Sequence, residues 1–108
     1  KIKGLGWLDG DVKLIKKFHN LPLPHMGWNR IKVENSNAKI LDGTHNKSFY
    51  FLHSYCLKMD SFEEIIATSE YGNPIVSVVN KNNIYGCQFH PEKSHASGLK
   101  ILENFAQI

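Results

Sequence analysis

A histidine and a glutamate stand two positions apart in the sequence, separated by Pro91. Side chains at i and i+2 of an extended segment point to the same side, and a proline biases the residue before it towards extended conformations. We therefore expect the side chains of His90 and Glu92 to project together. A carboxylate beside an imidazole fixes the ring tautomer and stabilises the protonated ring, as in triads of nucleophile, histidine and acid. The spacing predicts a general base with its orienting acid, although a surface histidine in a turn before a helix has the same spacing.

A base of this kind requires a nucleophile, and three residues are candidates. Cys87 is nearest in sequence, but its side chain is expected to face away from His90 and to pack in the core. Cys56 approaches His90 only if their strands are neighbours, and no Gly-x-Cys-x-Gly turn surrounds it. Ser94 suits the N-cap of the final helix better than a catalytic role. A small hydrolase built from Cys56 and His90 remains an alternative.

Six histidines also raise the question of a metal site. They show neither the i, i+4 pairing of a metal-binding helix nor a companion Cys-x-x-Cys pair. His53 lies among aromatic residues, where a hydrogen-bonded structural histidine is expected. The sequence therefore predicts no metal ion and no cofactor.

Strand-like patterns cover most of the chain. β-Branched and aromatic residues recur with period two between turn signals. The expected strands are residues 11–18, 28–33, 48–57, 65–70, 75–80 and 84–89. Along the strongest run, alternate residues from Phe49 to Tyr55 should share one face. Turns at 71–74 and 81–83 should connect the last three strands as a meander.

Two segments depart from the strand pattern. Pro22 and Pro24 should make residues 21–29 a rigid loop. Near the other end, apolar residues recur at helical spacing and predict a C-terminal helix packed on the sheet. These residues are Ile101, Leu102, Phe105 and Ile108. About six strands and one helix leave one sheet face uncovered, so we expect further chain or self-association to cover it.

Composition narrows the class of protein. The 108 residues are enough for one small domain, and their net charge of +3 is scattered rather than gathered in the stripe typical of nucleic-acid binders. We expect no signal peptide, and the sequence lacks the run of about 18 apolar residues that a membrane helix needs. Two cysteines without a disulfide framework indicate reduced thiols in the cytoplasm. Because the sequence does not begin with methionine, we expect a processed or truncated chain, or a piece of a larger one.

Four segments, in order, carry a resemblance to a known family. They are LPHMGWNRI, FYFLHSY, TSEYG and YGCQFHPEKSHASGLKILENF. Together they resemble the glutaminase subunit of imidazole glycerol phosphate synthase, a class I glutamine amidotransferase of histidine biosynthesis, from about Gly4 to Phe105. PHMGWN is specific to this branch, whereas QFHPE is shared with other class I amidotransferases. The resemblance implies an α/β, flavodoxin-like domain of which residues 1–108 are the C-terminal, strand-rich portion.

The family also implies roles for individual residues. A cysteine attacks the side-chain amide of glutamine, and the released ammonia passes to a cyclase subunit. His90 matches the base and Glu92 its orienting acid, while Ser54 and Tyr55 match the segment that holds glutamine. The positions that match the cyclase-facing surface are Trp28, Tyr50 and Lys93.

The departure from the family is the nucleophile. The family's Gly-x-Cys-Leu-Gly turn and its oxyanion loop lie before the matched region, and neither occurs in this sequence. The resemblance makes Cys56 and Cys87 non-catalytic positions. We therefore expect the chain alone to be inactive and to need the N-terminal half of the same domain as its partner. Two alternatives stay open, namely ammonia supply for amino-sugar synthesis in surface polysaccharides and a non-catalytic binding module derived from the same fold.

Overall fold

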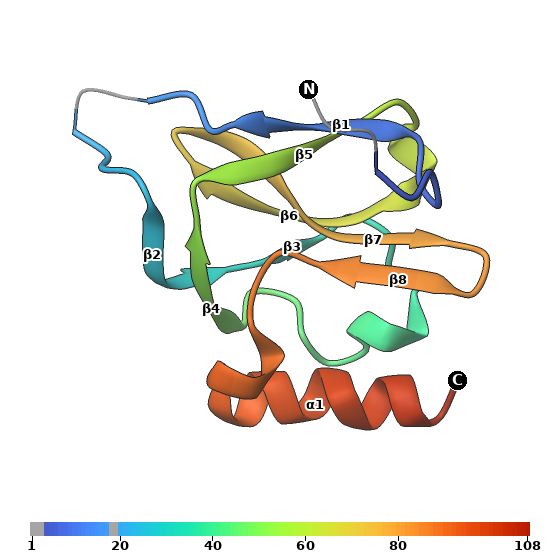
Figure 1. The fold of residues 1–108 in the computed structure, drawn as a ribbon. Coiled ribbons are helices and arrows are strands. Elements are labelled where there is room, and N and C mark those ends of the chain that lie inside the picture. Colours follow the sequence, from blue (N-terminus) through green and yellow to red (C-terminus); the bar gives the residue numbers. More distant parts are fainter. Residues whose placement is uncertain (1–3, 18–19) are drawn as a thin grey trace.

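The computed structural model describes residues 4–17 and 20–108 (Figure 1). Within these ranges the chain forms eight β-strands, three short 3₁₀ helices and one α-helix. The strands are β1 (Gly10–Leu14), β2 (His25–Arg30), β3 (Lys32–Val33), β4 (Ser48–His53), β5 (Tyr55–Met59), β6 (Ile65–Tyr71), β7 (Asn73–Lys81) and β8 (Ile84–Cys87). The helices are η1 (Lys39–Leu41), η2 (Phe62–Glu64), η3 (Pro91–Lys93) and α1 (His95–Ala106).

Every strand pair among the described residues is antiparallel, and the pairs form three sheets. β1 pairs with β5, β2 pairs with β4, and the largest sheet has the order β3-β6-β7-β8. In Figure 1 the β1–β5 ribbon lies at the top, and α1 runs along the bottom beneath β8 and η1. The predicted meander is confirmed, as is a strand-rich α/β portion with one C-terminal helix.

The run predicted as one strand at residues 48–57 is two strands. β4 and β5 are separated only by Ser54, where the chain bends and passes from the β2–β4 pair to the β1–β5 pair. The expected alternation of faces holds for Phe49 and Phe51, which are both 0% exposed. It ends at the bend, because Tyr55 is 57% exposed. One continuous alternating pattern in the sequence thus forms two strands that belong to different sheets.

The predicted boundaries of the first strands are wrong. β2 begins at His25, inside the segment expected to be a loop, because all six of its residues pair with β4. The fully buried Ile31 then separates β2 from β3. Strand pairing therefore prevails over the local effect of the prolines. β1 ends at Leu14, whereas the predicted strand continues to Phe18, which lies outside the described residues.

The core lies between β4, the β6–β7 pair and α1. Phe49 and Phe51 meet Phe89, with ring centroids 4.2 and 5.8 Å from that of Phe89. Aliphatic residues from the other elements complete this cluster, namely Ile31, Ile40, Leu41, Ile66, Val78 and Ile101. Because Phe89 precedes His90 directly, the core fixes the start of the segment that carries His90.

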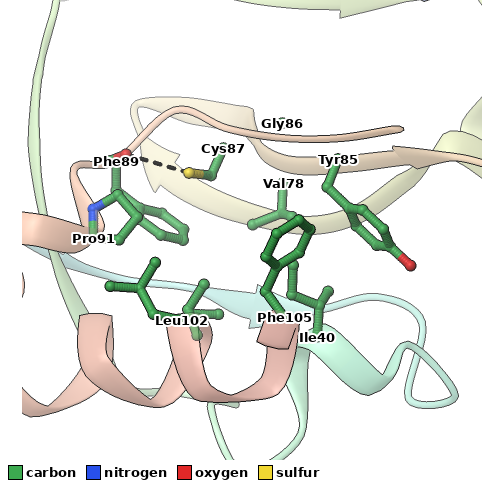
Figure 2. Close-up of a pocket in the computed structure, with 10 residues that line it drawn as sticks. Ile40, Val78, Tyr85, Gly86, Cys87, Phe89, Pro91, Leu102 and Phe105 are labelled. Carbon is green, nitrogen blue, oxygen red and sulfur yellow. Dashed lines mark hydrogen bonds between the residues drawn. The ribbon is translucent and has the colours of Figure 1, made fainter. Parts of the chain in front are cut away.

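Helix α1 forms as predicted, but it ends at Ala106, before the exposed Ile108, and its contact with the sheet is incomplete. Ile101 is buried, whereas Leu102 and Phe105 are 49% and 53% exposed. The latter two line an open cavity of about 170 Å³ between α1 and the β7–β8 pair (Figure 2). Asn104 holds the helix in place by donating from Nδ2 to two carbonyl oxygens in and after η1, at 3.0 and 2.9 Å.

Gly98 sets how closely α1 approaches η3. An ideal Cβ at this position would lie 1.9 Å from the carbonyl oxygen of Pro91. Alanine normally favours a helix over glycine by about 1 kcal/mol, but no rotamer change relieves a clash with a backbone oxygen. We expect Gly98→Ala to lower the free energy of unfolding by about 1–3 kcal/mol, measured by urea denaturation. Ser97→Ala on the same helix is the control and should change it by no more than about 0.5 kcal/mol; an equal effect of both substitutions would contradict the clash.

Candidate functional site

His90 and Glu92 form a hydrogen-bonded pair just after β8. The His90 backbone is extended (φ −101°, ψ 101°), and η3 then turns the chain so that Glu92 faces the imidazole. His90 Nδ1 lies 3.0 Å from Glu92 Oε2. The hydrogen bond from His90 is the main reason that the pKa of Glu92 lies below its usual range. Because a carboxylate only accepts, Nδ1 donates and Nε2 keeps a lone pair that can take a proton.

A closed set of hydrogen bonds holds the His90 backbone against β4. The His90 N–H donates to the Tyr50 carbonyl at 2.9 Å. The Tyr50 N–H donates to Ser94 Oγ at 2.9 Å, and the Ser94 hydroxyl donates to the His90 carbonyl at 2.6 Å. We call this set the Tyr50–His90–Ser94 clamp. Ser94 is 1% exposed and occupies the predicted N-cap position of α1, but its hydroxyl serves the clamp and makes no cap hydrogen bond.

Neither cysteine is an activated nucleophile. Cys87 does not pack in the core as predicted: it is exposed, lines the cavity between α1 and the β7–β8 pair, and donates from Sγ to the Phe89 carbonyl at 3.5 Å (Figure 2). Protein atoms around the thiol still exclude enough water to raise its pKa to about 11, and the charge of Glu92 adds to the rise. Burial also raises the pKa of Cys56, against the opposing charge of Lys58. Both thiols are therefore protonated at neutral pH.

Ser54 and Tyr55 lie at the bend between β4 and β5. Within the described residues, no hydrogen bond or ring contact joins either of them to His90. The residue before the bend, His53, does interact electrostatically with His90: its pKa is lowered mainly by burial and further by the charge of His90. His53 Nδ1 lies 2.8 Å from the Tyr55 carbonyl oxygen across the bend. His53 is thus the hydrogen-bonded histidine that the sequence predicts.

His25 is a residue of this region that the sequence does not single out. It lies opposite His53 in the β2–β4 register, and its Nδ1 is 2.9 Å from His53 Nε2. The His25 ring is 4% exposed and stacks between Phe51 and Tyr71, with centroid distances of 4.8 and 4.2 Å. Burial, and then His53, lower the pKa of His25 to about 4. In the sequence, His25 is marked only by its position directly after Pro24, and this position does not indicate that His53 is its hydrogen-bond partner.

Trp28 and Tyr50 form the centre of an exposed surface on β2 and β4. They are cross-strand neighbours with ring centroids 6.1 Å apart, and His95 stacks on Trp28 at 5.4 Å. Met26 and Leu52, the next pair but one along the ladder, extend this surface and are 64% and 40% exposed. Lys93 is the last residue of η3, and only Ser94 separates it in sequence from His95 of this surface. Met26 and Leu52 could have been assigned to this surface from the sequence, because each lies two positions from Trp28 or Tyr50 on the same strand. No nearby sequence pattern indicates that His95 joins them.

The cavity between α1 and the β7–β8 pair does not suit a polar substrate. Its lining residues are Ile40, Val78, Tyr85, Gly86, Cys87, Phe89, Pro91, Ile101, Leu102 and Phe105. Within the described part of the chain, no group of three or more histidine, cysteine or acidic side chains gathers at metal-binding distance. Among the same residues, no helix is long and apolar enough to cross a membrane.

Comparison with known proteins identifies the family. The family of class I glutamine amidotransferases matches residues 10–108, and the chain belongs to this family.

Individual relatives narrow the resemblance further. The chain is 49% identical over 108 residues to the imidazole glycerol phosphate synthase subunit HisH of Pelagibacter ubique, covering 98% of this chain and 51% of that protein. It is 45% identical over 108 residues to subunit HisH of Methanocaldococcus jannaschii, covering 99% and 53%. With subunit HisH 2 of Methanococcus maripaludis it shares 43% identity over 105 residues, covering 97% and 52%. The resemblance predicted from the sequence is confirmed, and the chain spans about half the length of the curated relatives it matches.

Removing the Ser94 hydroxyl tests the clamp. Ser94→Ala leaves the Tyr50 N–H and the His90 carbonyl without their partner in a buried position. We expect the free energy of unfolding to fall by about 1–3 kcal/mol, measured by urea denaturation. Ser61→Ala is the matched control, because Ser61, at the N-cap of η2, is likewise an N-cap serine without a side-chain cap hydrogen bond. If both variants lose the same stability, the clamp does not hold the segment.

The lowered pKa of His25 predicts acid sensitivity. The unfolded chain takes up this proton near the ordinary value of 6.5, whereas the folded chain does so at about 4. The stability is therefore complete above pH 6.5 and is lost as the pH falls towards 4, by about 2–3 kcal/mol for this group. His25→Phe keeps a ring between Phe51 and Tyr71 and should flatten the pH dependence measured by denaturation. An unchanged pH dependence in His25→Phe would refute the assignment.

Proposed function

We propose that this chain supplies the general base and the orienting acid of a glutaminase that hydrolyses glutamine to glutamate and ammonia. The observation that carries the proposal is the hydrogen bond from His90 Nδ1 to Glu92, which leaves Nε2 ready to take a proton. The Tyr50–His90–Ser94 clamp fixes the backbone from which the imidazole projects. Membership of the class I glutamine amidotransferases supports the choice of glutamine as substrate.

In the proposed reaction, His90 transfers protons and Glu92 orients its ring. His90 Nε2 takes the proton of a cysteine thiol, whose sulfur attacks the side-chain amide carbon of glutamine. The imidazolium then gives this proton to the departing nitrogen, and ammonia leaves as a thioester forms. Water activated by His90 hydrolyses the thioester to glutamate and restores the thiol. Glu92 stabilises the imidazolium and keeps its ring oriented throughout.

The nucleophile of the proposed reaction is a cysteine outside these 108 residues. The raised pKa values of Cys56 and Cys87 make both poor nucleophiles. The chain also spans about half the length of its curated relatives. The proposed site therefore combines His90 and Glu92 with a cysteine from polypeptide outside these 108 residues. In this site, glutamine binds against Ser54 and Tyr55.

The proposed partner is a synthase subunit that receives the ammonia. The proposed location of the reaction is the cytoplasm. The relatives are named subunits of imidazole glycerol phosphate synthase, which favours a cyclase subunit and histidine biosynthesis. Trp28, Tyr50 and Lys93 form the proposed contact surface. Trp28 is 51% exposed, and a large exposed aromatic residue within an apolar surface is typical of protein interfaces.

A fused protein tests the proposed activity. The part of the Pelagibacter ubique relative that this chain does not match is placed upstream of the chain, and glutamate release from glutamine is measured. We expect turnover from the fusion and none from the 108 residues alone, because a triad without its nucleophile loses several orders of magnitude in rate.

Variants of the fusion assign the base. His90→Ala should lower kcat by about a thousandfold or more, whereas His45→Ala, at a histidine on the loop between η1 and β4, should not change it. Turnover by the isolated chain, or full turnover in folded His90→Ala fusion, would refute the proposal. A fusion that folds, as judged by circular dichroism, but releases no glutamate would refute it as well.

A further inference from the structure

The tautomer of His53 follows from its two hydrogen bonds. Its Nδ1 lies 2.8 Å from the Tyr55 carbonyl oxygen, which only accepts, so Nδ1 carries the proton. This hydrogen bond spans the bend at Ser54, where β4 ends and β5 begins. The neutral ring therefore has its lone pair on Nε2. A neutral His53 with its proton on Nε2 instead would have no donor for the Tyr55 carbonyl.

His25 fixes that choice from the neighbouring strand. Its Nδ1 lies 2.9 Å from His53 Nε2, so the His25 Nδ1–H donates and His53 accepts. The remaining nitrogen, His25 Nε2, accepts from Asn29 Nδ2 at 3.3 Å. The hydrogen bonds thus run in one direction, from Asn29 to His25, from His25 to His53, and from His53 to the Tyr55 carbonyl.

Asn29 determines the direction of this series. Its Nδ2 also donates to the Glu70 carbonyl at 2.8 Å, and its Oδ1 accepts from the Arg30 N–H at 2.8 Å. Turning the amide over would place an oxygen against the Glu70 carbonyl and an NH₂ group against the Arg30 N–H. The NH₂ group is therefore held towards His25, whose Nε2 must accept.

The surroundings keep both rings neutral and in place. His25 is 4% exposed and stacks between Phe51 from β4 and Tyr71 from β6, so its ring cannot turn over to exchange its nitrogens. The titratable neighbours of the pair are Tyr71, on His25, and His90, whose charge lowers the pKa of His53. The pKa of His25 is lowered to about 4 by burial and by His53. The series is therefore complete at neutral pH.

We propose, resting on the function proposed above, that His25 is a positioning residue for glutamine binding. By donating to His53 Nε2, it keeps the His53 proton on Nδ1 and so holds the bend at Ser54 and Tyr55. These two residues are the proposed glutamine-binding segment. His25 touches neither glutamine nor His90 in this arrangement, so its removal should change substrate binding rather than the chemical step.

Kinetics of the fused protein separate positioning from a general structural role. His25→Phe keeps the stacked ring but removes the donor, and we expect the KM for glutamine to rise about tenfold while kcat changes less than about twofold. His25→Asn places an amide NH₂ near the position of Nδ1 and should recover most of this loss, to within about threefold of the original KM. His45→Phe should alter neither constant. A lower apparent kcat with an unchanged KM in His25→Phe would show a structural role only and overturn the proposal.

The ring nitrogen shifts of His53 provide a readout that needs no catalysis. Nuclear magnetic resonance of the 108-residue chain should show the His53 proton on Nδ1, and His25→Phe should shift the ring towards the form with its proton on Nε2. A His53 tautomer insensitive to His25→Phe would overturn the positioning role. Loss of turnover in the unmodified fusion would instead overturn the proposed glutaminase function, and these two failures are distinguishable.

Discussion

The attachment of His90 to β4 is the constraint on which the site depends. His90 follows β8 and precedes η3, so strand pairing ends before it and the helix begins after it. The Tyr50–His90–Ser94 clamp replaces the missing ladder with three short hydrogen bonds that satisfy the backbone of Tyr50 and His90 together. Phe89 secures the preceding residue by packing on Phe49. The imidazole of His90 thus projects from a fixed backbone, although the ring itself is exposed to solvent. Because the backbone is fixed, the hydrogen bond to Glu92 determines which ring nitrogen carries the proton.

Strand β4 gives each part of the proposed site a common support. Its buried residues Phe49 and Phe51 belong to the core, while Tyr50 faces outward beside Trp28. The Tyr50 backbone holds His90, and the Tyr50 ring belongs to the proposed partner surface. At the end of the same strand, His53 holds the bend that leads to Tyr55. The proposed base, substrate segment and partner surface are therefore placed relative to one another by the six residues of β4.

Local patterns predicted the features that depend on neighbours in sequence. The meander and the C-terminal helix follow from period and turn residues. His90 and Glu92 do meet as predicted, but not through an extended segment: His90 is extended before Pro91, and the 3₁₀ helix η3 then turns Glu92 towards the imidazole. Features that depend on distant segments were not predictable. The bend at Ser54 interrupts an unbroken alternating pattern because β4 and β5 pair with different strands, and Ser94 gives up its cap role because Tyr50 approaches from 44 positions away. The exposed position of Cys87 likewise depends on how far α1 stands from β8.

The central claim is that this chain holds an oriented base before any other part of the site is added. The position of the proton on the neutral His90 ring tests it most directly, through the ring nitrogen chemical shifts in the 108-residue chain. The hydrogen bond to Glu92 predicts a proton on Nδ1 and a bare Nε2, and Glu92→Ala should allow the proton to occupy either nitrogen. A proton mainly on Nε2 in the unmodified chain, or a tautomer indifferent to Glu92→Ala, would contradict the account.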